Sequence, residues 1–102
     1  MKVALQYWNA RELPDKRRFI ARQRSYHGST LGALSLSGFA ERRAPFARSL
    51  LEVAFVSAAN AYRPPPGAEG DTLVPFLAAE LDACIESMGA GNVAAFVFEP
   101  VV

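Results

Sequence analysis

The sequence predicts an α/β fold with a mainly parallel sheet and flanking helices. Two observations carry this prediction: short apolar runs alternate with helical patterns, and the last run is apolar without interruption. The segment Val93–Phe98 reads Val-Ala-Ala-Phe-Val-Phe, and a run without polar alternation is typical of a strand that is buried on both faces. We therefore expect it to be a central parallel strand. The order of helix, strand, helix, short helix, strand, helix and strand indicates parallel strands joined by crossover helices.

The first third of the chain predicts two helices around one strand. Residues 1–12 contain apolar residues and good helix formers, and nothing within them breaks a helix. Phe19–Ala21 is a short apolar run between arginines and predicts a strand. A polar loop follows, after which Ser29 or Thr30 is suited to cap a helix. We expect Gly38 to end that helix, because glycine favours the backbone conformation found at helix ends.

The middle of the chain predicts a basic helical stretch, a strand and a loop. Residues 40–51 form the helical stretch, which Pro45 interrupts, and Val53–Val56 are a brief apolar strand. Residues 60–70 hold three consecutive prolines and two glycines, which exclude regular structure and favour an extended loop. The next helix begins at residues 71–72.

This last helix carries one apolar stripe at helical spacing. Gly89 and Gly91 are expected to end it. The chain's one cysteine, Cys84, lies on the stripe, so we expect an inert core thiol, and a single cysteine excludes an intrachain disulfide. The stripe consists of Leu73, Phe76, Leu77, Leu81, Cys84, Ile85 and Met88.

Length and composition place the chain among globular proteins. Its 102 residues allow one small domain. Because 51% of the residues are hydrophobic and 21% are charged, a disordered chain is excluded. No segment approaches the roughly 20 apolar residues of a membrane-spanning helix. The amino-terminal residues lack the apolar region and cleavage site of a signal peptide.

The net charge of +1 hides an uneven distribution of charged residues. Residues 1–63 hold all 11 lysines and arginines against four acidic residues, whereas residues 64–102 hold six acidic residues and no basic one. We expect the two parts to neutralise each other or a neighbouring segment. A basic face for nucleic acid is the alternative, but no nucleic-acid motif is present and the basic residues are spread over several elements.

Residues capable of binding chemistry follow two of the predicted strands. Tyr26, His27 and Gly28 come after the strand Phe19–Ala21, and Glu99 comes directly after the last strand. In open parallel sheets, ligands bind beyond the carboxyl ends of the strands, so we expect both groups at the same edge. An aromatic residue next to glycine offers a flat face with room for a ring. The helix that follows presents free N–H groups to an anion.

Each of these candidates also has a structural alternative. On residue type alone, a tyrosine such as Tyr26 more often just covers the sheet edge. A lone histidine such as His27 is more often a hydrogen-bonded structural group than a base or ligand. No second histidine or nearby cysteine supports a metal site, so none is predicted. Neither Lys2 nor Lys16 lies at a predicted strand end. No serine-nucleophile elbow and no glycine-rich phosphate motif occurs.

Several short segments, taken in their order and at their intervals, resemble the class III aminotransferases. These are the pyridoxal-phosphate (PLP) enzymes of fold type I that include omega-amino-acid and acetylornithine-type transaminases. The more specific segments are residues 25–35, with Tyr-His-Gly-Ser-Thr, and residues 93–102, with Phe-Glu-Pro-Val. The resemblance covers nearly the whole chain. The other matching segments are Gln6–Trp8, Phe19–Arg22, Arg42–Arg43, Phe46 and Tyr62–Arg63.

The resemblance implies roles for four residues toward the cofactor PLP. Tyr26 matches the aromatic residue that stacks on the pyridine ring, and His27 and Gly28 line the same loop. Glu99 matches the glutamate that lies near the ring in this family. The interpretation therefore requires Tyr26 and Glu99 to face one shared crevice.

The resemblance also implies that residues 1–102 are an internal fragment of the large, PLP-binding domain. The phosphate-binding turn is expected before Met1, and the aspartate that pairs with the pyridine nitrogen is expected beyond Val102. The lysine that binds the cofactor covalently is also expected beyond Val102. We therefore assign no catalytic residue to this fragment and expect it to be inactive alone.

The activity implied for the parent protein is transamination, which moves an amino group from an amine or amino acid to a 2-keto acid. The parent is expected to be a homodimer, without nucleic-acid or membrane partners, and cytoplasmic. A mitochondrial location stays open for a parent whose amino terminus precedes this segment. The alternative is a non-catalytic α/β remnant or binding module. The same scaffold also supports aminomutase and decarboxylase chemistry, and the sequence does not name the amino donor or acceptor.

Overall fold

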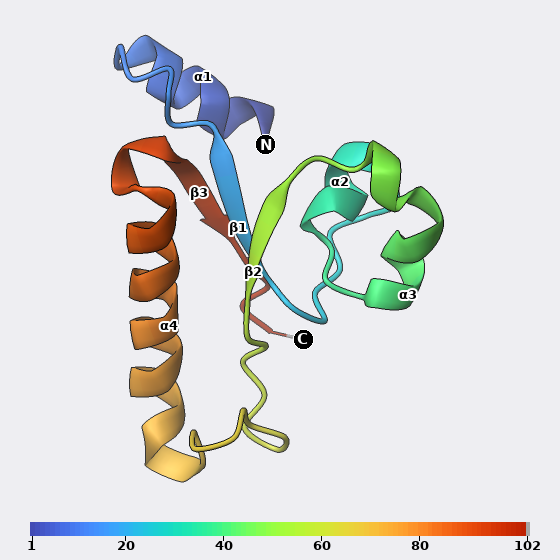
Figure 1. Cartoon of the computed structure of the whole chain (residues 1–102), viewed down its shortest axis with the longest axis vertical. Coiled ribbons are helices and arrows are strands. Elements are labelled where there is room, and N and C mark those ends of the chain that lie inside the picture. The colour runs from blue at the N-terminus through green and yellow to red at the C-terminus, as the bar shows by residue number, and fades with distance from the viewer. Residues whose placement is uncertain (102) are drawn as a thin grey trace.

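A computed structural model describes residues 1–101, which form a three-stranded parallel sheet with flanking helices (Figure 1). The predicted α/β class and the predicted order of elements are confirmed. Val102, the last residue of the matching segment 93–102, lies outside the described residues. The helices are α1 (Lys2–Ala10), α2 (Leu31–Leu36), α3 (Ala40–Arg43) and α4 (Leu73–Met88), and the strands are β1 (Arg18–Arg22), β2 (Val53–Val56) and β3 (Val93–Val97). Short 3-10 turns, η1 (Ala44–Ser49), η2 (Gly70–Thr72) and η3 (Ala90–Asn92), follow α3, precede α4 and precede β3.

The strand at the centre of the sheet is β1, in the order β2-β1-β3. Both neighbours run parallel to it, with Ile20 of β1 opposite Ala54 of β2 and Phe96 of β3. The expectation that Val93–Phe98 is central is therefore wrong for the described residues, since β3 lies at an edge. The apolar composition of β3 does not distinguish the two positions. Pairing on both sides and cover on both faces leave Ile20 without exposed surface.

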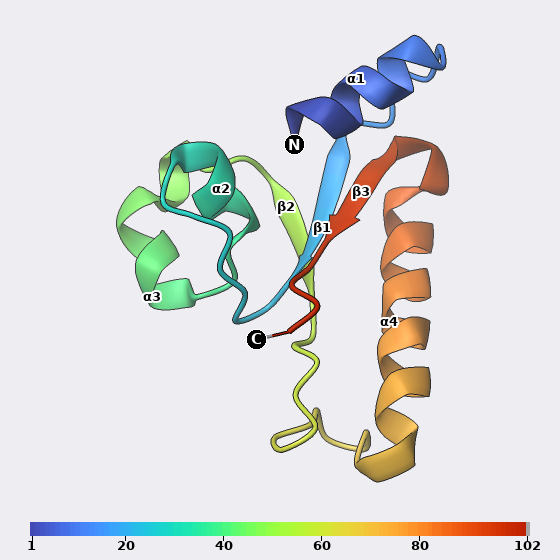
Figure 2. The ribbon, with the colours of Figure 1, turned by 180° about the vertical axis from the view of Figure 1, so that it is seen from behind.

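Helices cover the two faces of the sheet (Figures 1 and 2). On one face, Phe19 and Ala21 pack with Leu36 of α2, and side chains of α1 add to this cluster. The indole N–H of Trp8 in α1 donates to the Ala94 carbonyl of β3 over 2.7 Å, which ties the first helix to the last strand. On the other face, α4 packs beside β2.

A carboxylate of α4 fixes the carboxyl end of β2. Glu80 accepts hydrogen bonds from both the backbone N–H and the hydroxyl of Ser57, each over 3.0 Å. Ser57 is the first residue after β2. Because both carboxylate oxygens are used, this contact sets the position of α4 along the strand as well as its distance from it.

The apolar stripe of α4 is present as predicted, but it is only half covered. Leu73 is buried, while the other residues of the stripe are half-buried. Cys84 is free and half-buried, and burial, with a smaller contribution from the Glu80 charge, raises the pKa of its thiol. A raised pKa keeps the thiol protonated and unreactive at neutral pH, in line with the expected inert group. Gly89 ends the helix with a φ of +82°, which glycine adopts without strain.

The start of α2 agrees with the sequence, but its end does not. Thr30 is the N-cap, and its side chain accepts a hydrogen bond from the Ala33 N–H. The helix ends at Leu36, and Ser37 is already extended, so Gly38 is not a left-handed cap. A Cβ atom on Gly38 would overlap the backbone of residues 22–24. Glycine is required there because the chain leaving α2 presses directly against the chain leaving β1.

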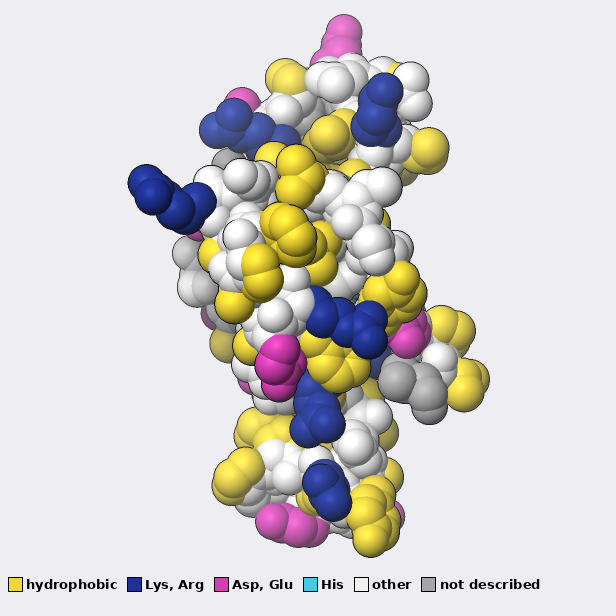
Figure 3. Space-filling view, turned by 90° about the vertical axis from the view of Figure 1, so that its right-hand side faces the viewer, with side chains coloured by type: hydrophobic (Ala, Val, Ile, Leu, Met, Phe, Trp, Pro, Cys, Tyr) yellow, Lys and Arg dark blue, Asp and Glu magenta, His cyan; other side chains and the backbone are white. Residues whose placement is uncertain are grey.

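Direct ion pairs do not join the basic and acidic parts of the chain within residues 1–101. The one ion pair among these residues links Arg18 to Glu52 over 2.6 Å, and both belong to the basic part. On the face shown in Figure 3, lysine and arginine side chains lie in several separate places among apolar and uncharged atoms. None of the helices in residues 1–101 has the length and apolar character needed to span a membrane.

Replacing Gly38 with alanine is expected to lower the free energy of unfolding by about 1–3 kcal/mol, because the added methyl group must displace the backbone. Urea denaturation measures this loss. Gly91→Ala is the matched control, since a Cβ at Gly91 would contact nothing within 4 Å. Equal stability of the two variants would contradict the tight fit at Gly38.

Candidate functional site

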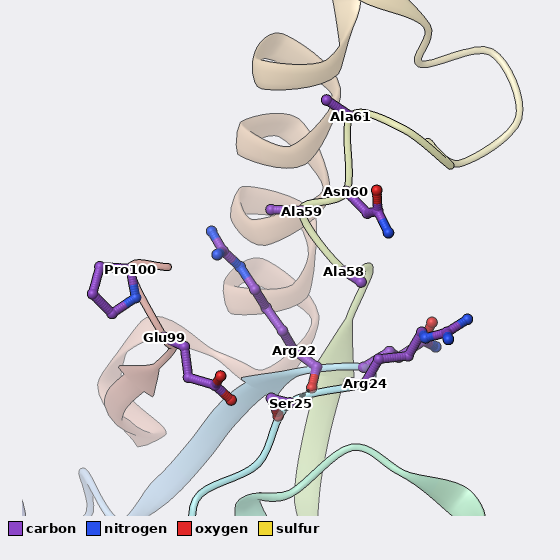
Figure 4. A pocket seen from close by; sticks show the side chains of 10 residues that line it. Arg22, Arg24, Ser25, Ala58, Ala59, Asn60, Ala61, Glu99 and Pro100 are labelled. Carbon is purple, nitrogen blue, oxygen red and sulfur yellow. Dashed lines mark hydrogen bonds between the residues drawn. The ribbon is translucent and has the colours of Figure 1, made fainter. Parts of the chain in front are cut away.

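The carboxyl ends of all three strands meet around one cavity of about 290 Å³ (Figure 4). It is lined by Arg22 at the end of β1, residues 23–25 after it, residues 58–61 after β2, and Glu99 and Pro100 after β3. The Arg22 side chain extends over this cavity, and its guanidinium lies against the rings of Phe96 and Phe98, at 5.5 and 4.9 Å from their centroids. This edge is where ligands bind in open parallel sheets.

Tyr26 and Glu99 lie together at this edge. The backbone N–H of Tyr26 donates to the Glu99 carboxylate over 2.5 Å, although 73 positions separate the two residues. The expectation that they share one edge of the sheet is therefore confirmed. Tyr26 is not among the residues that line the cavity beside Glu99, so the shared crevice stays a prediction. The contact fixes the backbone of the loop after β1 against the residue that follows β3. The tyrosine ring takes no part in this hydrogen bond.

The ring of Tyr26 is only partly covered. It is 48% exposed, and its hydroxyl lies 3.4 Å from the hydroxyl of Ser29. The guanidinium of Arg42 lies over the ring, 5.3 Å from its centroid. An exposed aromatic ring whose backbone is fixed offers a flat surface on which another ring can stack.

Gly28 has a backbone that other residues rarely adopt. Its φ is +127°, and a Cβ atom there would lie 2.9 Å from the Cβ of Ala33. Glycine therefore allows the loop to pass close to the first turn of α2. This is a structural requirement for the glycine of the Tyr-His-Gly segment.

His27 is held by its backbone, while one ring nitrogen is unsatisfied. Its N–H donates to the hydroxyl of Ser37 over 2.9 Å. Its Nε2 is buried and has no hydrogen-bond partner within residues 1–101. The ring borders a hollow shared with Met1 and Lys2 of the amino-terminal helix, and it does not line the cavity beside Glu99. The ring of His27 and the carboxylate of Glu99 therefore line different hollows. The neighbouring residue Tyr26 contacts Glu99 through its backbone N–H.

Two buried serines tie the Tyr26 loop to the end of α2. The hydroxyl of Ser25 donates to the Arg22 carbonyl over 2.7 Å and lies 3.2 Å from the Leu36 carbonyl. Ser37, which has no exposed surface, accepts from His27 and donates to the Ala33 carbonyl over 3.0 Å. These contacts fix the loop to α2, in addition to its contact with Glu99.

The residues present fit an aromatic cofactor with hydrogen-bonding groups. The half-exposed ring of Tyr26 supplies a stacking surface, and the unsatisfied buried Nε2 of His27 calls for a polar partner from outside these residues. A metal ion finds no such support, since residues 1–101 contain no group of three or more metal-ligating side chains.

Sequence reasoning missed three residues that shape the site: Arg22, Ser37 and Arg42. Arg42 belongs to a matching segment, but its spacing from Tyr26 gives no sign of contact. Ser37 was missed because a hydroxyl that bonds to a distant backbone group leaves no periodic signal. Arg22 was noted only as a flank of the strand Phe19–Ala21 and as part of a matching segment.

Comparison with known proteins shows which family the chain belongs to. The family model described as "Aminotransferase class-III" matches residues 1–102. The chain belongs to the class-III aminotransferases. It is 44% identical to an uncharacterized aminotransferase, YodT, of Bacillus subtilis, and 37% identical to the mitochondrial gamma-aminobutyrate transaminase 1 of rice, in each case over its full length.

Solved transaminase structures share the fold of this class-III segment. An omega transaminase from Pseudomonas jessenii in complex with PMP is 31% identical, with a TM-score of 0.89 over 99% of this chain. An amine transaminase from an uncultivated Pseudomonas species, in its PLP-bound form, is 29% identical with a TM-score of 0.90 over 98% of this chain. The chain spans 23% of the Bacillus relative's length, 20% of the rice relative's, and 22% and 23% of the two solved chains.

Replacing Ser37 with alanine is expected to lower the free energy of unfolding by about 1–3 kcal/mol, because the N–H of His27 loses its buried acceptor. Amide hydrogen exchange at His27 should accelerate as well. Ser87→Ala is the control, since the hydroxyl of Ser87 lies exposed on α4 and donates only to the Cys84 carbonyl. Unchanged exchange at His27 would show that the loop does not depend on Ser37.

Proposed function

We propose that residues 1–102 are an internal part of the large, PLP-binding domain of a class-III aminotransferase. The parent enzyme moves an amino group from an amine or amino acid to a 2-keto acid. The observation that carries this proposal is the hydrogen bond from the Tyr26 N–H to the Glu99 carboxylate. It sets an exposed aromatic ring at the edge where parallel sheets bind ligands.

Four residues of the chain are assigned to the cofactor. When bound, PLP supplies an electron sink for the bonds around the carbon that carries the amino group. Tyr26 would stack on the pyridine ring and hold its orientation, which would contribute about 0.5–1.5 kcal/mol beyond the area buried. Glu99 holds the backbone of Tyr26, and Gly28 gives the loop its close approach to α2. His27 offers its unsatisfied Nε2 to a polar group of the complete site.

The catalytic lysine is assigned to a part of the parent outside this chain. Within residues 1–101, Lys16 extends to the opposite end of the sheet, where its Nζ donates to the Ala90 carbonyl over 2.7 Å, just before β3 begins. Lys2 lies in α1, beside the His27 hollow. Neither lysine lines the cavity at the carboxyl ends of the strands. The chain therefore contributes binding and orientation, and the covalent step belongs to the parent.

The parent is further proposed to be a homodimer located in the cytoplasm. Class-III relatives include a mitochondrial enzyme of rice, so a leader ahead of this segment would change the location and leave the chemistry unaffected. Amines, amino acids and keto acids are the partners proposed for the site.

In the full-length enzyme that carries this segment, Tyr26→Ala is expected to weaken PLP binding by about two- to twelvefold, the equivalent of the stacking energy. Tyr26→Phe should retain the affinity, because the ring is kept. Titration of the apoenzyme with PLP, followed by cofactor fluorescence, measures the change. Tyr62→Ala is the control, since Tyr62 is 88% exposed on the loop before α4. Equal affinities of Tyr26→Ala and the unmodified enzyme would remove Tyr26 from the site.

The 102-residue chain alone is expected to lack transaminase activity, because it does not place a lysine at the cofactor edge. Dialysis with PLP, followed by a visible spectrum, should leave no absorption band that changes when an amine donor is added. A stable band that responds to amine donors would contradict this assignment of the lysine. Complete absence of PLP binding in the full-length enzyme would favour the alternative, a non-catalytic α/β module.

A further inference from the structure

The tyrosine ring assigned to the cofactor has a cation against one of its faces. The guanidinium carbon of Arg42 lies 5.3 Å from the Tyr26 centroid and 5.4 Å from the centroid of Phe39. Arg42 is exposed, and no acidic side chain pairs with it within residues 1–101. Its charge is therefore directed to the two rings, and a planar guanidinium is suited to lie against such faces.

The position of Arg42 is fixed by its neighbour Arg43. One guanidinium nitrogen of Arg43 donates to three carbonyls at the end of α2, those of Leu34, Ser35 and Ser37, over 2.8 to 2.9 Å. These contacts pair the Ser35 and Ser37 carbonyls, of the kind that a helix end otherwise leaves unpaired, and add a second donor to the Leu34 carbonyl, which already accepts from the Ser37 N–H. They also hold α3 against α2, and from α3 the Arg42 side chain reaches the Tyr26 ring. The two adjacent arginines thus have different tasks.

We propose that Arg42 is a positioning residue for the cofactor: it covers one face of the Tyr26 ring and leaves the opposite face for the pyridine ring. This inference rests on the proposed function of Tyr26. The backbone of Tyr26 is fixed by Glu99, but that contact does not set the rotation of the ring. With 48% of its surface exposed, the side chain has one polar contact besides Arg42, through its hydroxyl, which lies 3.4 Å from that of Ser29 at the far end of the ring. The guanidinium supplies the missing restraint, and pre-orientation reduces the ordering that binding requires.

The test uses the full-length enzyme with the variants Arg42→Met, Arg42→Lys and Tyr26→Ala, and the double variant Arg42→Met with Tyr26→Ala. Arg42→Met is expected to raise the dissociation constant of PLP by about two- to fivefold, the equivalent of an exposed cation–π contact. Arg42→Lys should show a smaller rise in the dissociation constant, because lysine keeps the positive charge but lacks the planar guanidinium. Arg48→Met is the matched control, since Arg48 lies exposed on η1.

The double variant distinguishes positioning from other roles. In the Tyr26→Ala background, Arg42→Met should no longer change PLP affinity, because the ring that it positions is gone. The visible circular dichroism of the bound cofactor should change in Arg42→Met while the urea midpoint stays constant, which a purely structural residue would not produce. An equal loss of affinity in both backgrounds would overturn the inference, since Arg42 would then contact the ligand directly.

Two further outcomes separate this inference from the proposed function. If Tyr26→Ala weakens PLP binding and Arg42→Met does not, the role of Arg42 is refuted and the site of Tyr26 stands. If Tyr26→Ala itself has no effect, the assignment of Tyr26 fails, and the inference for Arg42 fails with it.

Discussion

The absence of a side chain at Gly38 is the constraint on which the site depends. The chain leaving α2 presses against the chain leaving β1, and the Gly38 N–H donates to the Ser25 carbonyl over 2.9 Å while its own carbonyl accepts from the Arg24 N–H over 3.1 Å. This junction places Ser37 where it can accept from His27, and it starts the loop that carries Tyr26 at a defined point. The backbone contact at Gly38 thus determines where the side chains of the site lie.

Much of the fold follows from patterns that are local in the sequence. The strand Phe19–Ala21, the N-cap Thr30 and the helix stop at Gly89 are all visible in the residues themselves. The order of the strands in the sheet is not visible in the sequence. An apolar run shows that both faces of a strand are covered, but it does not show how many strands pair with it. For this reason β3 was expected at the centre, and β1 occupies that place.

The candidate site was predictable only in part. The approach of Tyr26 to Glu99 follows from the rule that parallel strands end at one edge. The contacts of Ser37, Arg42 and Arg43 do not follow from any rule of spacing, since each joins a side chain to a group whose location depends on packing. The role of Gly38 illustrates the same limit: its residue type indicated a special position, while the reason was a close approach and not a helix cap.

The bond from Trp8 to Ala94 joins positions that are 86 residues apart, and it has a consequence for how the segment is made. During synthesis the amino-terminal helix emerges from the ribosome long before its partner strand, and the central strand β1 likewise waits for both of its neighbours. Contacts of such long range slow folding and leave apolar surface open in the meantime. Until β3 has been translated, the apolar side chains of α1 and β1 that pack against it therefore stay uncovered.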